Sequence, residues 1–212
     1  MIAQPPRRIT LEGQYTRLEP LDPVQHLEDL WQRVGGAEHA QLWTWMPYGP
    51  YLSKEALLAD LQAKASTSDP LFFAILDRAA GHALGMASLM RIDPKHGVIE
   101  VGGILFSPEL QKSRIATEAM YLLARHIFED LGNRRYEWKC NSLNEPSRRA
   151  ALRLGFQFEG IFRQHMVTKG QNRDTVWFSM LDTEWPARKQ EFERWLAPEN
   201  FSPDGVQLSR LA

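Results

Sequence analysis

The sequence has little of what disulfide-bonded, exported or membrane proteins need. Among 212 residues there is one cysteine, Cys140, so an internal disulfide is excluded. No signal-peptide pattern opens the chain, and Arg7-Arg8 is followed by Ile-Thr-Leu-Glu-Gly rather than by the apolar run of a twin-arginine signal. No stretch approaches the length of a membrane span. We therefore expect a cytoplasmic protein.

The sequence also lacks an excess of positive or of negative charge. Lys plus Arg number 25 against 26 for Asp plus Glu, which gives a formal net charge of −1. Such a balance argues against wholesale binding to nucleic acid or to a membrane surface. The histidines are scattered, without Cys or carboxylate partners at ligand spacing, so we expect no metal. A Walker-type phosphate loop and the Gly-x-Gly-x-x-Gly dinucleotide pattern are also absent.

The stretch from Gly103 to Met120 organises the chain. It contains an apolar strand end, a turn with Pro108, and a helix whose start is polar and cationic. The apolar residues Ile115, Ala119, Leu122, Leu123 and Ile127 recur at helical spacing and predict a face that packs on a sheet. The first amides of such a helix have no partner within it, and with the helix dipole they form a site for phosphate oxygens.

The remaining periodicities predict one α+β domain with a mixed, mostly antiparallel sheet flanked by helices. Its length of 212 residues is enough to bury a sizeable core. Gly102-Gly103 inside a strand predicts a bulge or a ligand lying against the backbone. We expect residues 1–9 to be a loose arm, 10–197 to be the domain, and 198–212 to be a tail that is loose or docked. The predicted strands are 15–21, 71–76, 82–92, 98–106, 135–140, 156–168 and 174–181, with helices at 23–34, from 53, from about 114, 144–155 and 184–196.

Two blocks of the sequence resemble a known family. Pro108, then Gln-x-x-x-x-Ala-Thr-Glu-Ala from Gln111, resembles the acetyl-CoA pyrophosphate loop of the GNAT N-acetyltransferases. Asn144-x-x-Ser147, a short helix, Gly-Phe and then Glu-Gly resemble the ribosomal-protein N-acetyltransferase (RimJ/RimL-like) branch. Both blocks occur in the family's order, and the similarity spans roughly residues 10 to 185. The resemblance implies the GNAT acyl-CoA N-acyltransferase fold and the cofactor acetyl-CoA.

In that fold the strands ending near Phe106 and Cys140 run parallel and splay apart, and the pantetheine arm lies in the gap. The family's loop usually has glycine where this chain has Lys112 and Arg114, because absent side chains let the backbone approach the pyrophosphate. Arg114 either crowds the phosphates or bonds one of their oxygens, and we expect the second. The cofactor-binding residues that the resemblance implies are Ile104, Leu105, Phe106, Gln111, Lys112, Ser113, Arg114, Ile115, Ala116, Thr117, Asn144, Ser147 and Arg153.

Two residues are candidates for catalysis. Glu100 matches a position where many family members carry a carboxylate that takes a proton from the amine, and the alternative is an exposed residue or an electrostatic contact. Ser147 is a donor suited to the departing thiolate, while the Tyr that many members use falls at Ala151. Its alternative is a local hydrogen bond at a helix start. Cys140 is more easily a buried structural thiol than a nucleophile, so we expect direct transfer in a ternary complex.

The acceptor is the least determined part of the prediction. In the resembling family, the segment between the first two strands forms one wall of the acceptor site, so Trp43 and Trp45 are candidates, although large aromatics often only fill a core. Glu100, His165 and Asp174 are further candidates. The resemblance favours a peptide or protein N-terminus. The alternatives are a small amine, amino acid or antibiotic, and a non-catalytic acyl-CoA-binding module; homodimerisation stays open.

Overall fold

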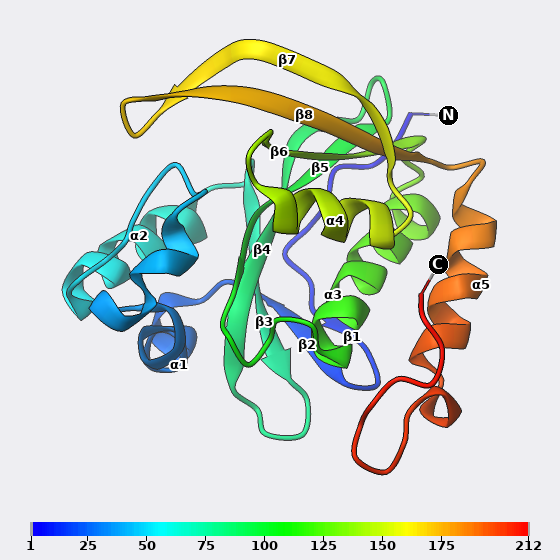
Figure 1. Cartoon of the computed structure of the whole chain (residues 1–212), viewed down its shortest axis with the longest axis horizontal. Coiled ribbons are helices and arrows are strands. Elements are labelled where there is room, and N and C mark those ends of the chain that lie inside the picture. The colour runs from blue at the N-terminus through cyan, green and yellow to red at the C-terminus, as the bar shows by residue number, and fades with distance from the viewer. Residues whose placement is uncertain (1, 212) are drawn as a thin grey trace.

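A computed structural model describes residues 2–211, which are arranged around one eight-stranded sheet (Figure 1). The strand order is β1-β2-β3-β4-β5-β6-β8-β7, and every neighbouring pair except β5 and β6 is antiparallel. The predicted α+β class with a mixed sheet is thus confirmed. The strands are β1 (Leu11–Glu12), β2 (Thr16–Pro20), β3 (Leu71–Asp77), β4 (Ala83–Asp93), β5 (Val98–Phe106), β6 (Arg135–Asn141), β7 (Gln157–Thr168) and β8 (Gln171–Leu181).

Helices cover both faces of the sheet, because successive strand residues point to opposite sides. On β3, Phe73 and Ile75 belong to the core cluster that includes α3 and α5, whereas Phe72 and Ala74 belong to the cluster that includes α1 and α2. No helix within residues 2–211 is both long and apolar enough to cross a membrane. The helical segments are α1 (Pro23–Val34), η1 (Ala37–Trp43), α2 (Lys54–Ser66), α3 (Arg114–Arg125), the π-helical turn η2 (His126–Asp130), α4 (Glu145–Arg153), α5 (Trp185–Leu196) and η3 (Pro198–Asn200).

The sheet opens between its two parallel strands. β5 and β6 pair from Val98 opposite Arg135 to Val101 opposite Trp138, and beyond that point they have no pairing with each other. The predicted splay of these two strands is therefore present. It leaves the side of β5 beyond Val101 that faces β6 without a strand neighbour, while β4 still pairs with the other side.

A β-bulge lies on β5 just where the gap begins. Ser88 of β4 is opposite Gly102 and Met86 is opposite Leu105, so β5 carries one extra residue between them. Gly103 has a φ of 57°, and a Cβ atom there would lie 2.9 Å from the Phe72 ring. Only glycine fits both the conformation and the space. The predicted bulge is confirmed.

Both ends of the described chain pack against the domain. The Ala3 and Gln4 amides donate to the Pro94 and Leu131 carbonyls, and Ala3 is buried. The expected loose arm is therefore anchored to the domain at Ala3 and Gln4. At the other end, Phe201 packs edge-to-face on Trp195 of α5 with 5.0 Å between ring centres. The tail is docked, which is one of the two expected outcomes.

Candidate functional site

The start of α3 presents unpaired backbone donors. Ser113 caps the helix, and its Oγ accepts the Ala116 N–H at 3.0 Å. The amides of Lys112, Arg114 and Ile115 have no acceptor within residues 2–211. Lys112 has a φ of 58°, the left-handed backbone that glycine adopts most easily, so this lysine keeps the loop shape that the resembling family builds with glycine. Three free amides at a helix N-terminus form an anion site.

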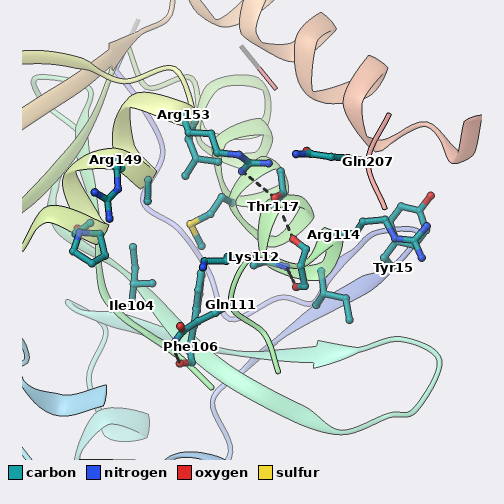
Figure 2. A pocket seen from close by; sticks show the side chains of 18 of the residues that line it. Tyr15, Ile104, Phe106, Gln111, Lys112, Arg114, Thr117, Arg149, Arg153 and Gln207 are labelled. Atoms are coloured by element: carbon teal, nitrogen blue, oxygen red, sulfur yellow. Dashed lines mark hydrogen bonds between the residues drawn. The ribbon is translucent and has the colours of Figure 1, made fainter. Parts of the chain in front are cut away.

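A cavity of about 1520 Å³ extends from this helix start along the splayed end of β5 to α4. Figure 2 shows Phe106, Ile104, Lys112 and Arg153 around it. The cavity therefore joins the anion site to the gap between β5 and β6. All of the residues that the sequence predicted for the cofactor line it: Ile104, Leu105, Phe106, Gln111, Lys112, Ser113, Arg114, Ile115, Ala116, Thr117, Asn144, Ser147 and Arg153.

Arg114 lies between two aromatic rings. Its guanidinium carbon is 4.7 Å from the centre of the Tyr15 ring and 4.6 Å from that of Phe201. Figure 2 shows Arg114 and Tyr15 side by side at one end of the cavity. Both rings lie within the range of a cation–π interaction with the guanidinium, whose N–H groups are donors suited to an anion. That Arg114 bonds a phosphate stays a prediction.

Arg153 is oriented from two sides. It donates to Thr117 Oγ1 at 3.2 Å, and its guanidinium carbon is 4.9 Å from the Trp195 ring centre. Burial lowers the pKa of this guanidinium. Neither contact is predictable from a motif, because Thr117, Arg153 and Trp195 are far apart in the sequence. Lining residues that the sequence analysis missed include Tyr15, Met120, Trp138, Arg149, Trp195, Phe201 and Gln207.

The Ser147 hydroxyl is held by an indole. Asn144 caps α4 by accepting the Ser147 N–H at 3.2 Å, and Trp138 Nε1–H donates to Ser147 Oγ at 2.9 Å. Since the oxygen already accepts from the indole, the hydroxyl hydrogen is left to be donated elsewhere. No pattern in the sequence indicated the bond between Trp138 and Ser147. Burial raises the pKa of the Cys140 thiol, as expected for a core thiol.

Glu100 lies on the opposite face of the sheet. Its neighbours Ile99 and Val101 pack in the core with α3, so the Glu100 side chain points away from the cavity, whose lining does not include it. The carboxylate is 3% exposed and pairs with Arg91 at 2.7 Å and Lys139 at 2.8 Å. Burial raises the pKa of Glu100, and the two cations oppose that rise.

The other expected acceptor residues are spread over the molecule. Trp43 is fully buried and donates through Nε1 to the Val34 carbonyl at 2.7 Å, so it has no surface for a ligand. Trp45 lines the cavity. His165 lies on the same face as Glu100, with Nδ1 2.9 Å from Thr175 Oγ1. Asp174 points to the opposite side of β8 from Thr175 and accepts the Gln164 N–H at 2.7 Å.

An open sheet between two parallel strands, with a helix N-terminus at the gap, is the architecture of the acyl-CoA N-acyltransferases. The acetyltransferase (GNAT) domain matches residues 16–157, and the chain belongs to this family. The resemblance inferred from the motifs is thus confirmed.

Relatives of known structure extend the match beyond that domain. A GCN5-related N-acetyltransferase from Brucella melitensis is 48% identical, covers 99% of this chain and 95% of its own, and has a TM-score of 0.96. A GNAT-family acetyltransferase from Chromobacterium violaceum is 39% identical, with coverages of 88% and 92% and a TM-score of 0.82. YdaF of Bacillus subtilis, named as a ribosomal N-acetyltransferase, is 32% identical over 51% of this chain. That match spans only 59% of YdaF.

Proposed function

We propose that this protein transfers the acetyl group of acetyl-CoA to a primary amine by direct attack in a ternary complex. The observation that carries the proposal is the single cavity that connects the free amides at the start of α3 with the open side of β5 and with Ser147. The amides of Lys112, Arg114 and Ile115 would hold the pyrophosphate. The backbone of β5 would bond the pantetheine amides, which brings the thioester to the gap.

In the transfer, the amine nitrogen bonds the acetyl carbon and the carbon–sulfur bond breaks. The amine must first lose a proton, and Glu100, whose raised pKa brings it closer to neutrality, is the proposed acceptor of that proton, directly or through a water. The departing thiolate needs a donor, and the Ser147 hydroxyl is the proposed one. The alternative role for Glu100 is an electrostatic contact with the amine.

The proposed acceptor class is a peptide or protein N-terminus. The name of YdaF supports it, although the matched segment covers only part of that protein. A small amine, an amino acid or an antibiotic is the alternative, and a non-catalytic acyl-CoA-binding module is the least supported one because both Glu100 and Ser147 are present.

The test has two stages. Acetyl-CoA at millimolar concentration should raise the melting temperature, because a ligand that binds the native state stabilises it. A turnover screen with peptides, amino acids, polyamines and aminoglycosides should then identify the acceptor. A folded sample that shows no thermal shift with acetyl-CoA would overturn the cofactor assignment, and binding without any turnover would favour the non-catalytic module.

A further inference from the structure

One cation on the face opposite the cavity has no partner. Arg173 on β8 is half-buried, and it makes no ion pair and no side-chain hydrogen bond with any of residues 2–211. Its Nε atom is fully buried without an acceptor. Burial lowers the pKa of this guanidinium and the nearby Arg91 lowers it further, while Cys140 and the carboxylate of Glu100 oppose that effect. A desolvated, unpaired donor is costly and calls for an acceptor that the protein itself does not supply.

The neighbouring charges make this exception clear. Lys139 lies between Glu100 and Glu137, at 2.8 Å from each carboxylate. Arg135 forms a two-pronged pair with Glu159, with nitrogen–oxygen distances of 2.7 and 2.6 Å. Within residues 2–211, the neighbouring Glu100, Glu137, Lys139 and Arg135 each pair with a residue of opposite charge. Arg173 has no such partner.

A second donor without an acceptor lies on the same side of the same strand. Trp177 is four residues from Arg173, and strand alternation places both on one face. Its Nε1 is buried and has no acceptor within residues 2–211. Lys139 pairs with Trp177 across the strands, and its ammonium lies 3.6 Å from the indole ring centre. Trp177 therefore contacts the ion-pair cluster of Arg91, Glu100, Glu137 and Lys139, the Glu100 cluster.

These donors lie on the face of the sheet that points away from α3. In the proposed function the cofactor occupies the α3 side of the gap, which leaves the Glu100 side for the amine. Thr175 is opposite Asn141, the last residue of β6, and Arg173 lies two residues further, beside the open end of the gap. The hairpin tip bends over this face, and Lys169 Nζ donates to the Trp43 carbonyl at 2.9 Å (Figure 1).

We infer that the acceptor amine carries a carboxylate, which Arg173 binds through charge-assisted hydrogen bonds, with the Trp177 indole N–H as a further donor. The inference rests on the proposed function and narrows the class of acceptor to amines that carry a carboxylate. The carboxylate comes either from a free amino acid or from an acidic side chain near a peptide N-terminus. Polyamines and aminoglycosides, which are polycations, are poor acceptors at such a site.

The experiment compares matched acceptors. Amino acids are tested against their carboxamides, and short peptides with Asp at the second position are tested against the same peptides with Asn. Specificity (kcat/KM) is measured for the wild type, Arg173→Gln and Trp177→Phe. Arg163→Gln is the control, because Arg163 is exposed and lies with Asp174 on the other side of the hairpin. Acetyl-CoA binding is measured for each variant.

In the wild type we expect the carboxylate form to be preferred by about tenfold or more, the size of one charge-assisted hydrogen bond. Arg173→Gln should abolish the preference mainly through KM, Trp177→Phe should weaken it, and Arg163→Gln should leave it unchanged. A preference among the amino acids identifies a free amino acid as the source of the carboxylate, and a preference among the peptides identifies an acidic side chain near a peptide N-terminus.

The inference is overturned if carboxamides or polyamines are used equally well, if the preference survives in Arg173→Gln, or if acetyl-CoA binds and no carboxylate acceptor is acetylated. Failure of acetyl-CoA to bind would instead overturn the proposed function, so the two failures are distinguishable.

Discussion

The two faces of the sheet treat polar groups in opposite ways. On the α3 face, backbone amides at the helix start and the edge of β5 have no protein partner and border a large cavity. On the other face, Glu100, Lys139 and Glu137 satisfy one another across adjacent strands, whereas within residues 2–211 Arg173 makes no ion pair and the Trp177 indole N–H has no acceptor. In the proposed function the first face binds the large cofactor, and we infer that the second binds the smaller carboxylate of the acceptor.

The largest expected effect tests whether the two faces have separate roles, cofactor binding on one face and proton removal from the amine on the other. Glu100→Gln should keep acetyl-CoA affinity, because Glu100 is outside the cavity, and should lower turnover about a hundredfold at neutral pH. The wild-type rate should fall as pH drops through the raised pKa of Glu100, since a base acts only when deprotonated. The variant should lack that limb and recover at high pH, where the amine deprotonates unaided. A pH–rate profile of unchanged shape would leave Glu100 an electrostatic contact only.

The next effect concerns the cavity side. Ser147→Ala removes the proposed donor to the thiolate and should lower kcat about ten- to a hundredfold, with little dependence on pH. Because the hydroxyl is one contact among many, the thermal shift with acetyl-CoA should remain. Steady-state kinetics over a range of pH check this. Full activity in this variant would show that the Ser147 hydroxyl serves only as the acceptor for the Trp138 indole N–H.

An effect of comparable size would sharpen the comparison at the helix start. If Arg114 bonds a phosphate, Arg114→Gly should weaken acetyl-CoA binding by about 1.5 to 3 kcal/mol and reduce its salt sensitivity. Titration of acetyl-CoA and dephospho-CoA at low and moderate salt measures both. Tighter binding would mean that Arg114 is held between Tyr15 and Phe201 for packing alone and obstructs the pyrophosphate.

The smallest effect is that of the indole behind Ser147. Trp138→Phe keeps most of the ring packing, removes the N–H that orients the hydroxyl, and should lower kcat by about three- to tenfold, as expected for one neutral hydrogen bond. In the Ser147→Ala background the same change should have no further effect. A double-mutant cycle makes the comparison, and additive losses would assign Trp138 a packing role instead.

The two faces also differ in how far the sequence predicts them. The cofactor side is encoded in contiguous blocks, Gln111 to Ala119 and Asn144 to Ser147, so a short motif specifies the loop, the cap and the helix together. The Gly103 bulge followed from paired glycines in one strand. By contrast, the Glu100 cluster joins β4, β5 and β6, and its register appears only once the strands pair.

Long-range side-chain contacts explain the remaining misses. Trp43 was a candidate because it is aromatic and lies in the family's acceptor segment, yet its fully buried position depends on Tyr48, Tyr51 and the end of α1. Arg173 gave no signal at all, because an arginine in a hairpin is ordinarily solvated. That Arg173 lacks an ion pair becomes visible only in the folded structure, where the ion pairs of the neighbouring charged residues can be assigned.

The docked tail has a consequence for how the protein is made. Phe201 and Gln207 line the cavity, and Leu211 is buried against the body of the domain. A chain still emerging from the ribosome can form the sheet and α3 before these residues are free. During that interval the helix start is present but its far wall is not. If acyl-CoA binds in this cavity as proposed, it can stabilise the nascent domain fully only after residue 211 has left the exit tunnel, which would make ligand capture a late event in biosynthesis.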